Sequence, residues 1–111
     1  VGRSTTRPSP DRSVRAVFEI TTFRLAPGVD EEVFRSLDER VQVEVAYHQP
    51  GLLRRSLGRH DDGRWLVLQV WATRDDAEAG RAALDASPFG ARFLALLEPG
   101  SVVVERFDGV D

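Results

Sequence analysis

The most restrictive feature of this sequence is the segment from Arg64 to Thr73, RWLVLQVWAT, in which odd-numbered and even-numbered positions alike carry apolar residues. In a β-strand, successive side chains point to opposite faces of the sheet. One face would carry Trp65, Val67, Gln69 and Trp71, and the other would carry Leu66, Leu68 and Val70. A strand that is apolar on both faces needs protein on both sides, so the fold must supply two covering layers.

Turn and capping signals divide the rest of the chain into strands and helices. Pro-Gly pairs at 27–28, 50–51 and 99–100 mark turns, and Asp62-Gly63 favours a tight hairpin. Asp30 and Thr73 are suited to cap the helices that follow them. The predicted elements are strand 14–25, a helix from Asp30 to the turn at 50–51, strands 52–59 and 64–73, a helix over 75–86 that is interrupted at Ser87-Pro88 and resumes over 89–98, and strand 101–107.

The order βαββαβ predicts an α+β fold of ferredoxin-like topology, in which both helices cover one side of a four-stranded antiparallel sheet. The second apolar face of segment 64–73 would then lie open in a single chain. A second copy of the chain, packed face to face, is the predicted cover, because soluble monomers rarely expose a large apolar patch. The expected assembly is a homodimer.

The length of 111 residues favours one domain with one core. Residues 1–13, VGRSTTRPSPDRS, lack apolar periodicity and are predicted to be a flexible tail, which leaves 14–111 as the domain. No apolar run approaches the ~20 residues that cross a bilayer, and no secretory signal opens the chain. We therefore expect a cytoplasmic protein without membrane contact.

Composition excludes several kinds of chemistry. The chain has no Cys, Lys, Met or Asn, so it has no thiol nucleophile, no thiolate metal site and no Schiff-base lysine. Its net charge of -3 argues against a nucleic-acid partner. All 15 basic residues are Arg, which is typical of a GC-rich bacterial genome.

Four segments resemble the dimeric α/β-barrel superfamily, and in particular its antibiotic-biosynthesis-monooxygenase-like branch. They are FRLAPG, QPGLLRRSL, DGRWLVLQVWATRDDAEA and SPFGARFLALLEP, within a likeness that runs from about Val17 to Phe107. The resemblance implies a dimeric α/β barrel. It does not single out one activity, because this scaffold hosts monooxygenases, haem-degrading enzymes, cyclases, isomerases and proteins without known activity.

The site residues of the family carry over only in part. Members with cofactor-free oxygenase activity bind an aromatic substrate between sheet and helices, near a Trp and an Asn. The Trp is matched by Trp71, but the places of the Asn fall at Phe23 or Val67. The haem-ligating His of the haem-degrading branch falls at Phe93, so the resemblance implies neither haem degradation nor any other cofactor.

His48 is the predicted catalytic residue. Helical spacing places it on an inward stripe with Phe34, Leu37, Val41 and Val45. With an ordinary pKa of ~6.5, a histidine there could act as a general base toward a phenolic or enolic substrate. The alternative is that His48 caps the helix end or bonds the Gln49-Pro50 backbone. Glu44 could orient it, or could form a solvated ion pair.

The residues predicted to contact a substrate lie on the inward faces of strands and helices. They are Trp71, Trp65, Phe23, Gln69, Thr21, Phe93 and Phe89. Plain core packing is the alternative for each aromatic residue. Glu19 shares this side of the sheet. Because burial of an unpaired carboxylate is costly, Glu19 either has a hydrogen-bonded role or lies exposed near the start of its strand, and we expect exposure. Tyr47 is predicted to point away from the inward stripe.

Two charged groups have simpler interpretations. His60, Asp61 and Asp62 lie in the predicted hairpin, where Asp-Asp-Gly serves the turn, and a single imidazole predicts no metal site. Arg54 and Arg55 alternate along a strand, so one of them would face inward and could meet a substrate anion. A salt bridge at the dimer edge is the alternative.

Together these patterns predict a small homodimeric enzyme that acts on an aromatic or polyketide-like molecule without a metal or organic cofactor. The reaction would be an oxygenation, or a proton transfer such as cyclisation or isomerisation. His48 would be the base and Trp71 a stacking wall. The alternative is a non-catalytic or stress-associated dimer that binds a hydrophobic ligand. A weaker third possibility is an interaction module that uses the Arg-rich tail.

Overall fold

A computed structural model describes residues 15–111 of the chain, so the predicted tail at 1–13 lies outside the described residues. The elements follow the predicted order, with the second helix in two pieces. They are β1 (Ala16–Phe23), α1 (Glu31–Glu44), the short 3₁₀ helix η3 (Ala46–His48), β2 (Leu52–Arg59), β3 (Trp65–Trp71), α2 (Arg74–Ala86), α3 (Pro88–Ala95) and β4 (Val103–Gly109).

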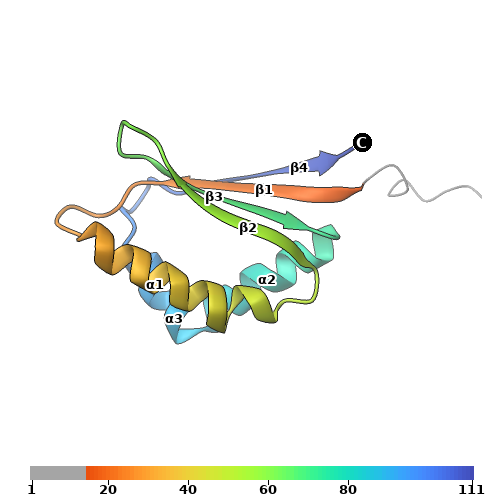
Figure 1. Ribbon diagram of the computed structural model, residues 1–111, viewed down its shortest axis with the longest axis horizontal. Coiled ribbons are helices and arrows are strands. Elements are labelled where there is room, and N and C mark those ends of the chain that lie inside the picture. The colour runs from red at the N-terminus through yellow and green to blue at the C-terminus, as the bar shows by residue number, and fades with distance from the viewer. Residues whose placement is uncertain (1–14) are drawn as a thin grey trace, which may run out of the picture.

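The strands form one sheet in the order β2-β3-β1-β4, and every neighbouring pair is antiparallel. All the helices lie on one side of this sheet, and its other side is uncovered (Figure 1). The predicted α+β fold with ferredoxin-like topology is therefore confirmed.

Side-chain caps define where the helices begin. Asp30 Oδ1 accepts a hydrogen bond from the backbone N–H of Glu32 at 2.7 Å, and Thr73 Oγ1 accepts one from that of Asp76 at 3.0 Å. Ser87 Oγ accepts a bond from the N–H of Phe89 at 3.2 Å and so starts α3 where α2 ends. These caps satisfy N–H groups that have no partner within the helix. None of the helices in the range 15–111 is long and apolar enough to span a membrane.

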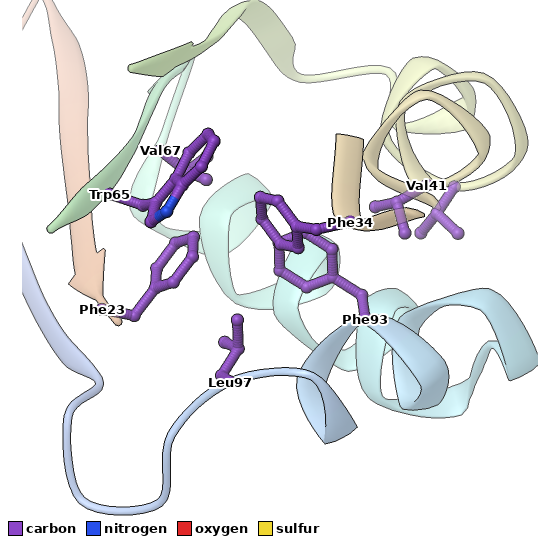
Figure 2. Packing of buried hydrophobic residues seen from close by; sticks show 8 residues of the cluster. Phe23, Phe34, Val41, Trp65, Val67, Phe93 and Leu97 are labelled. Carbon is purple, nitrogen blue, oxygen red and sulfur yellow. The ribbon is translucent and has the colours of Figure 1, made fainter. Parts of the chain in front are cut away.

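An aromatic cluster fills the layer between sheet and helices at the end that carries the β2–β3 hairpin (Figure 2). The Phe34 ring lies 5.0 Å from the Trp65 ring and 5.8 Å from the Phe23 ring, in edge-to-face geometry. Phe93 of α3 lies 5.2 Å from Phe34 and 6.0 Å from Phe23. Edge-to-face contacts of this kind stabilise the core beyond simple burial of area.

The side of the sheet away from the helices is apolar, as the alternation along β3 predicts. We call it the outward face; its large apolar residues are Phe18, Ile20, Leu66, Leu68, Val70, Val103 and Phe107. Phe18 is 36% exposed and Phe107 is 48% exposed, and the two are register partners on β1 and β4. A single chain therefore leaves one apolar layer in contact with water.

Candidate functional site

A cavity of about 80 Å³ lies between the sheet and the helices. Its apolar walls come from every layer of this side of the molecule: Phe23 of β1, Val67 and Trp71 of β3, Val41 of α1, Leu84 of α2, and Phe93 and Leu94 of α3. Val102 and Val104 also line it and are 40% and 37% exposed, so the cavity reaches solvent beside β4.

A row of polar residues crosses all four strands on the cavity side. The strand register places Arg55 of β2 opposite Gln69 of β3, Gln69 opposite Glu19 of β1, and Glu19 opposite Arg106 of β4. Directly opposed residues of antiparallel strands point to the same face, so these four side chains share one side of the sheet. We call them the polar row. Three of them, Arg55, Gln69 and Glu19, line the cavity.

Glu19 is buried, with 7% of its surface exposed, so its predicted exposure is wrong. Gln69 Nε2 donates to Glu19 Oε1 at 3.0 Å, and Arg106 Nε donates to Glu19 Oε2 at 2.8 Å. Both carboxylate oxygens are therefore satisfied without water, which removes the cost that argues against burial.

Of the two alternating arginines on β2, Arg55 faces inward. Its Nη2 and Nη1 atoms donate to the two carboxylate oxygens of Asp38 at 2.7 Å and 3.2 Å. The side chains are only 3% and 8% exposed, so this is a buried ion pair between the sheet and α1. Arg55 therefore pairs within its own chain, and the alternative of a salt bridge at a dimer edge does not apply to it. Sequence reasoning did not select Asp38, although its spacing of four residues from Phe34 places it on the inward stripe.

Two buried N–H donors, each on a residue that lines the cavity, lack a hydrogen-bond partner within the described residues. They are Arg55 Nε and Trp71 Nε1. Buried polar groups are almost always hydrogen-bonded, because an unmade bond costs the full desolvation of the donor. These two donors therefore mark positions where an acceptor atom would be stabilised.

Five of the seven residues predicted to contact substrate line the cavity: Thr21, Phe23, Gln69, Trp71 and Phe93. The structure places the other two elsewhere. Trp65 packs on Phe34 in the aromatic cluster. Phe89 is half-buried, and the Arg40 and Arg92 guanidinium carbons lie 4.6 Å and 5.7 Å from its ring centre.

His48 is exposed and is not part of the cavity lining, so its predicted inward position is wrong. The α-helix ends at Glu44, and Val45, with φ of -122°, leads into the 3₁₀ helix that ends at His48. A 3₁₀ helix has three residues per turn, whereas an α-helix has 3.6, so each side chain points in a different direction from the one that α-helical spacing predicts. Gln49 lines the cavity instead. Glu44 pairs with Arg40 at 3.8 Å, in the solvated pair that was the alternative to orienting His48.

The acidic cluster in the hairpin serves the turn. His60 Nδ1 accepts a bond from the Asp62 N–H at 3.0 Å, and the Asp62 carboxylate accepts bonds from Arg64 N and Nε, each at 2.9 Å. The backbone hydrogen bond from Arg64 is the largest cause of a pKa of Asp62 below its ordinary value. Across residues 15–111, no group of three or more His, Asp or Glu side chains is arranged to hold a metal ion.

No protein-family model matches the chain, and no curated protein matches it. Solved structures do match. A mutant of SnoaB, a cofactor-independent oxygenase from Streptomyces nogalater, has a TM-score of 0.71 at 21% identity and covers 87% of this chain and 95% of its own. A Caulobacter crescentus protein, provisionally named an antibiotic biosynthesis monooxygenase, has a TM-score of 0.70 at 20% identity, covering 89% of this chain and 93% of its own.

A third similar structure is Rv0793 from Mycobacterium tuberculosis, with a TM-score of 0.67 at 19% identity over 86% of this chain and 96% of that chain. At such identities the likeness concerns the fold, which can carry many activities. The chain therefore has the fold of the antibiotic-biosynthesis-monooxygenase-like proteins, as the resemblance of its sequence segments predicts.

Proposed function

We propose that the protein is a small homodimeric enzyme that acts on an aromatic or polyketide-like molecule, as a cofactor-independent oxygenase or as a cyclase or isomerase. The observation that carries this proposal is the helix-side cavity, which joins apolar walls and the buried Trp71 indole to the polar row. Apolar cavities with a few convergent polar groups are the usual form of a small-molecule site. The shared fold with the cofactor-independent oxygenase SnoaB supports this reaction class.

The size of the cavity favours a compact ligand. Its volume of about 80 Å³ is below the range of roughly 300–1,000 Å³ for sites that enclose drug-sized ligands. An engineered cavity of about 150 Å³ binds benzene, so this smaller space suits one end of a ligand rather than a whole ring system. The remainder of a larger ligand would extend along β4, where exposed Val102 and Val104 line the cavity.

The candidate proton acceptor within the cavity is Glu19. It is the one carboxylate among the described residues that line the cavity, whereas the predicted base His48 lies outside. Removal of a proton from a ring carbon or hydroxyl would give an electron-rich anion, which reacts with O2 or rearranges. Removing a positioned base generally lowers the rate about 10²- to 10⁴-fold, so its loss is readily measured.

Oxygen uptake in the presence of an anthrone tests the proposal. Oxidation of the ring CH2 to a carbonyl consumes one O2, places one oxygen atom in the quinone and releases the other as water. We expect enzyme-dependent uptake in this ratio, a loss of about 10²-fold or more in Glu19→Gln, and retained turnover in the matched control His48→Ala. Conversion of an aromatic polyketide analogue without uptake would indicate the cyclase or isomerase reaction.

A second candidate, a non-catalytic protein that binds a hydrophobic ligand, is favoured by one specific observation. Both oxygens of Glu19 are already engaged, by Gln69 at 3.0 Å and by Arg106 at 2.8 Å. A carboxylate held by two hydrogen bonds is as consistent with a structural role as with a role in proton transfer. Tight binding of hydroquinones and anthrones with neither uptake nor conversion would support this function and contradict the enzyme.

The homodimer in the proposal is supported by the outward face. This face has a shallow apolar hollow lined by Phe18, Ile20, Leu68, Val70 and Phe107. Another apolar surface would remove it from contact with water. Arg54 on β2 and Glu105 on β4 lie on this side at opposite edges of the sheet. In a face-to-face pair related by a twofold axis along the strands, Arg54 of each copy would approach Glu105 of the other.

A further inference from the structure

We propose that the cavity recognises a keto or phenolate oxygen of its ligand through two donors, the Arg55 Nε–H and the Trp71 Nε1–H. This inference rests on the proposed function and deepens it, because it names the chemical group by which the substrate is held. Both donors are buried and without a partner in the described part of the chain, and both residues line the cavity. A ligand oxygen with two lone pairs supplies what each donor lacks.

The two donors lie on neighbouring strands. Arg55 of β2 is the register partner of Gln69, and Trp71 follows Gln69 by two residues on the same side of β3. They are therefore diagonal neighbours, a spacing that long side chains readily bridge. An acceptor placed between them would also lie beside the polar row, which holds Glu19 and Gln69.

Asp38 positions Arg55 for this role. It engages both terminal nitrogens, Nη1 and Nη2, at 3.2 Å and 2.7 Å, which leaves Nε as the unused donor. The opposite charges of the pair balance each other, so a neutral carbonyl can bind without leaving a buried charge unpaired. A donor fixed beforehand also stabilises negative charge that develops on the same oxygen, as when a ketone becomes an enolate.

Trp71 is held equally firmly. A Cβ atom at Gly80 of α2 would lie 2.1 Å from the far edge of the indole ring, so the ring rests directly on the helix backbone. Only 2% of Trp71 is exposed. A ring confined in this way keeps the direction of its Nε1–H, which lowers the entropic cost of binding.

The competing explanation is an ordered water that satisfies both donors. Buried waters typically make about three hydrogen bonds, and the cavity has room for one. A water of that kind would remain whether or not the ligand carries an oxygen. Two ligands that differ only in a carbonyl group therefore separate the explanations.

The test compares 1-tetralone with tetralin, which has the same two rings but no oxygen, by ligand-observed NMR titration of the full chain. We expect wild type to bind 1-tetralone about 10-fold more tightly than tetralin. Arg55→Lys keeps a charge opposite Asp38 but has no Nε–H, and Trp71→Phe keeps an aromatic face but has no indole N–H. Each should weaken 1-tetralone binding about 3- to 10-fold and leave tetralin binding nearly unchanged.

Arg54→Lys, on the outward face of the same strand, is the matched control and should alter neither affinity. Thermal unfolding reports whether each variant is folded. If Arg55→Lys is not folded, the preference of wild type for 1-tetralone over tetralin tests the inference. Equal affinity of wild type for the two ligands, or unchanged 1-tetralone binding in both variants, would overturn the inference. Binding needs no turnover, so a missing O2 uptake would contradict the proposed function while leaving a measured keto preference intact.

Discussion

At the scale of single residues, the buried charges within residues 15–111 are paired. Asp38 and Arg55 form a bidentate pair whose side chains are 8% and 3% exposed. On the same helix, Glu44 and Arg40 form a pair at 3.8 Å with 42% and 58% of the side chains exposed. Removing one partner from a buried pair strands the other charge in a medium of low dielectric constant, whereas water screens an exposed pair.

We therefore predict that Asp38→Ala lowers the free energy of unfolding by about 3 kcal/mol or more, because it leaves the Arg55 guanidinium buried and unpaired. Glu44→Ala, at the exposed pair, should lower it by less than about 0.5 kcal/mol. Urea denaturation followed by circular dichroism measures both. Replacing both partners, as Asp38→Leu with Arg55→Leu, should recover part of the loss. Equal effects of the two alanine substitutions would contradict this account.

At the scale of secondary-structure elements, the approach of α2 to β3 decides the shape of the cavity. Gly80 lies on the face of α2 that meets the Trp71 ring, where any side chain would collide with it at 2.1 Å. Glycine inside a helix costs roughly 1 kcal/mol relative to alanine. At this position the cost is offset by close contact between the helix backbone and a large buried ring, which alanine would prevent.

We predict that Gly80→Ala lowers the free energy of unfolding by about 1–2 kcal/mol in spite of its better helix propensity, because overpacking outweighs that gain. Trp71→Phe removes the ring atoms that the new methyl group would meet. The double variant should therefore be more stable than the sum of the single effects implies, in a double-mutant cycle measured by urea denaturation. Ala79→Gly, at an exposed position of the same helix, measures the propensity effect alone. Additive single effects would show that the contact is not tight.

At the scale of the whole molecule, the sheet is apolar on both faces but the helices can cover only one of them. The helices cover one side of the sheet, and the outward face is left with Phe18 and Phe107 at 36% and 48% exposure (Figure 1). Covering such a face removes apolar area from water and stabilises association, at about 25 cal/mol for each Å² before the costs of binding are subtracted.

We predict that the wild-type protein sediments as a dimer at micromolar concentration. Phe107→Glu should shift it to the single chain, because a carboxylate on the covered outward face would be desolvated without a partner. Val33→Glu, at a 57% exposed apolar position of α1 on the other side of the molecule, should leave the dimer intact. Circular dichroism should show the same secondary structure in all three proteins. A wild-type protein that sediments as a lone chain would contradict the homodimer.

The sequence alone predicts the order of the elements, the helix caps at Asp30 and Thr73, and the two faces of β3, because these depend on contacts between neighbours in the chain. It also predicts five residues that line the cavity, since alternation along a strand settles which side a residue occupies.

The tertiary structure decides which charged side chains are buried, and in which direction the side chains point after α1. Glu19 is buried because Arg106, 87 residues away, bonds to it, and no local pattern contains that contact. His48 turns outward because the chain tightens into a 3₁₀ helix after Glu44, which helical spacing does not anticipate. Local periodicity thus determines which way each element faces, whereas the partners that make a buried charge stable are brought together only when distant strands pair.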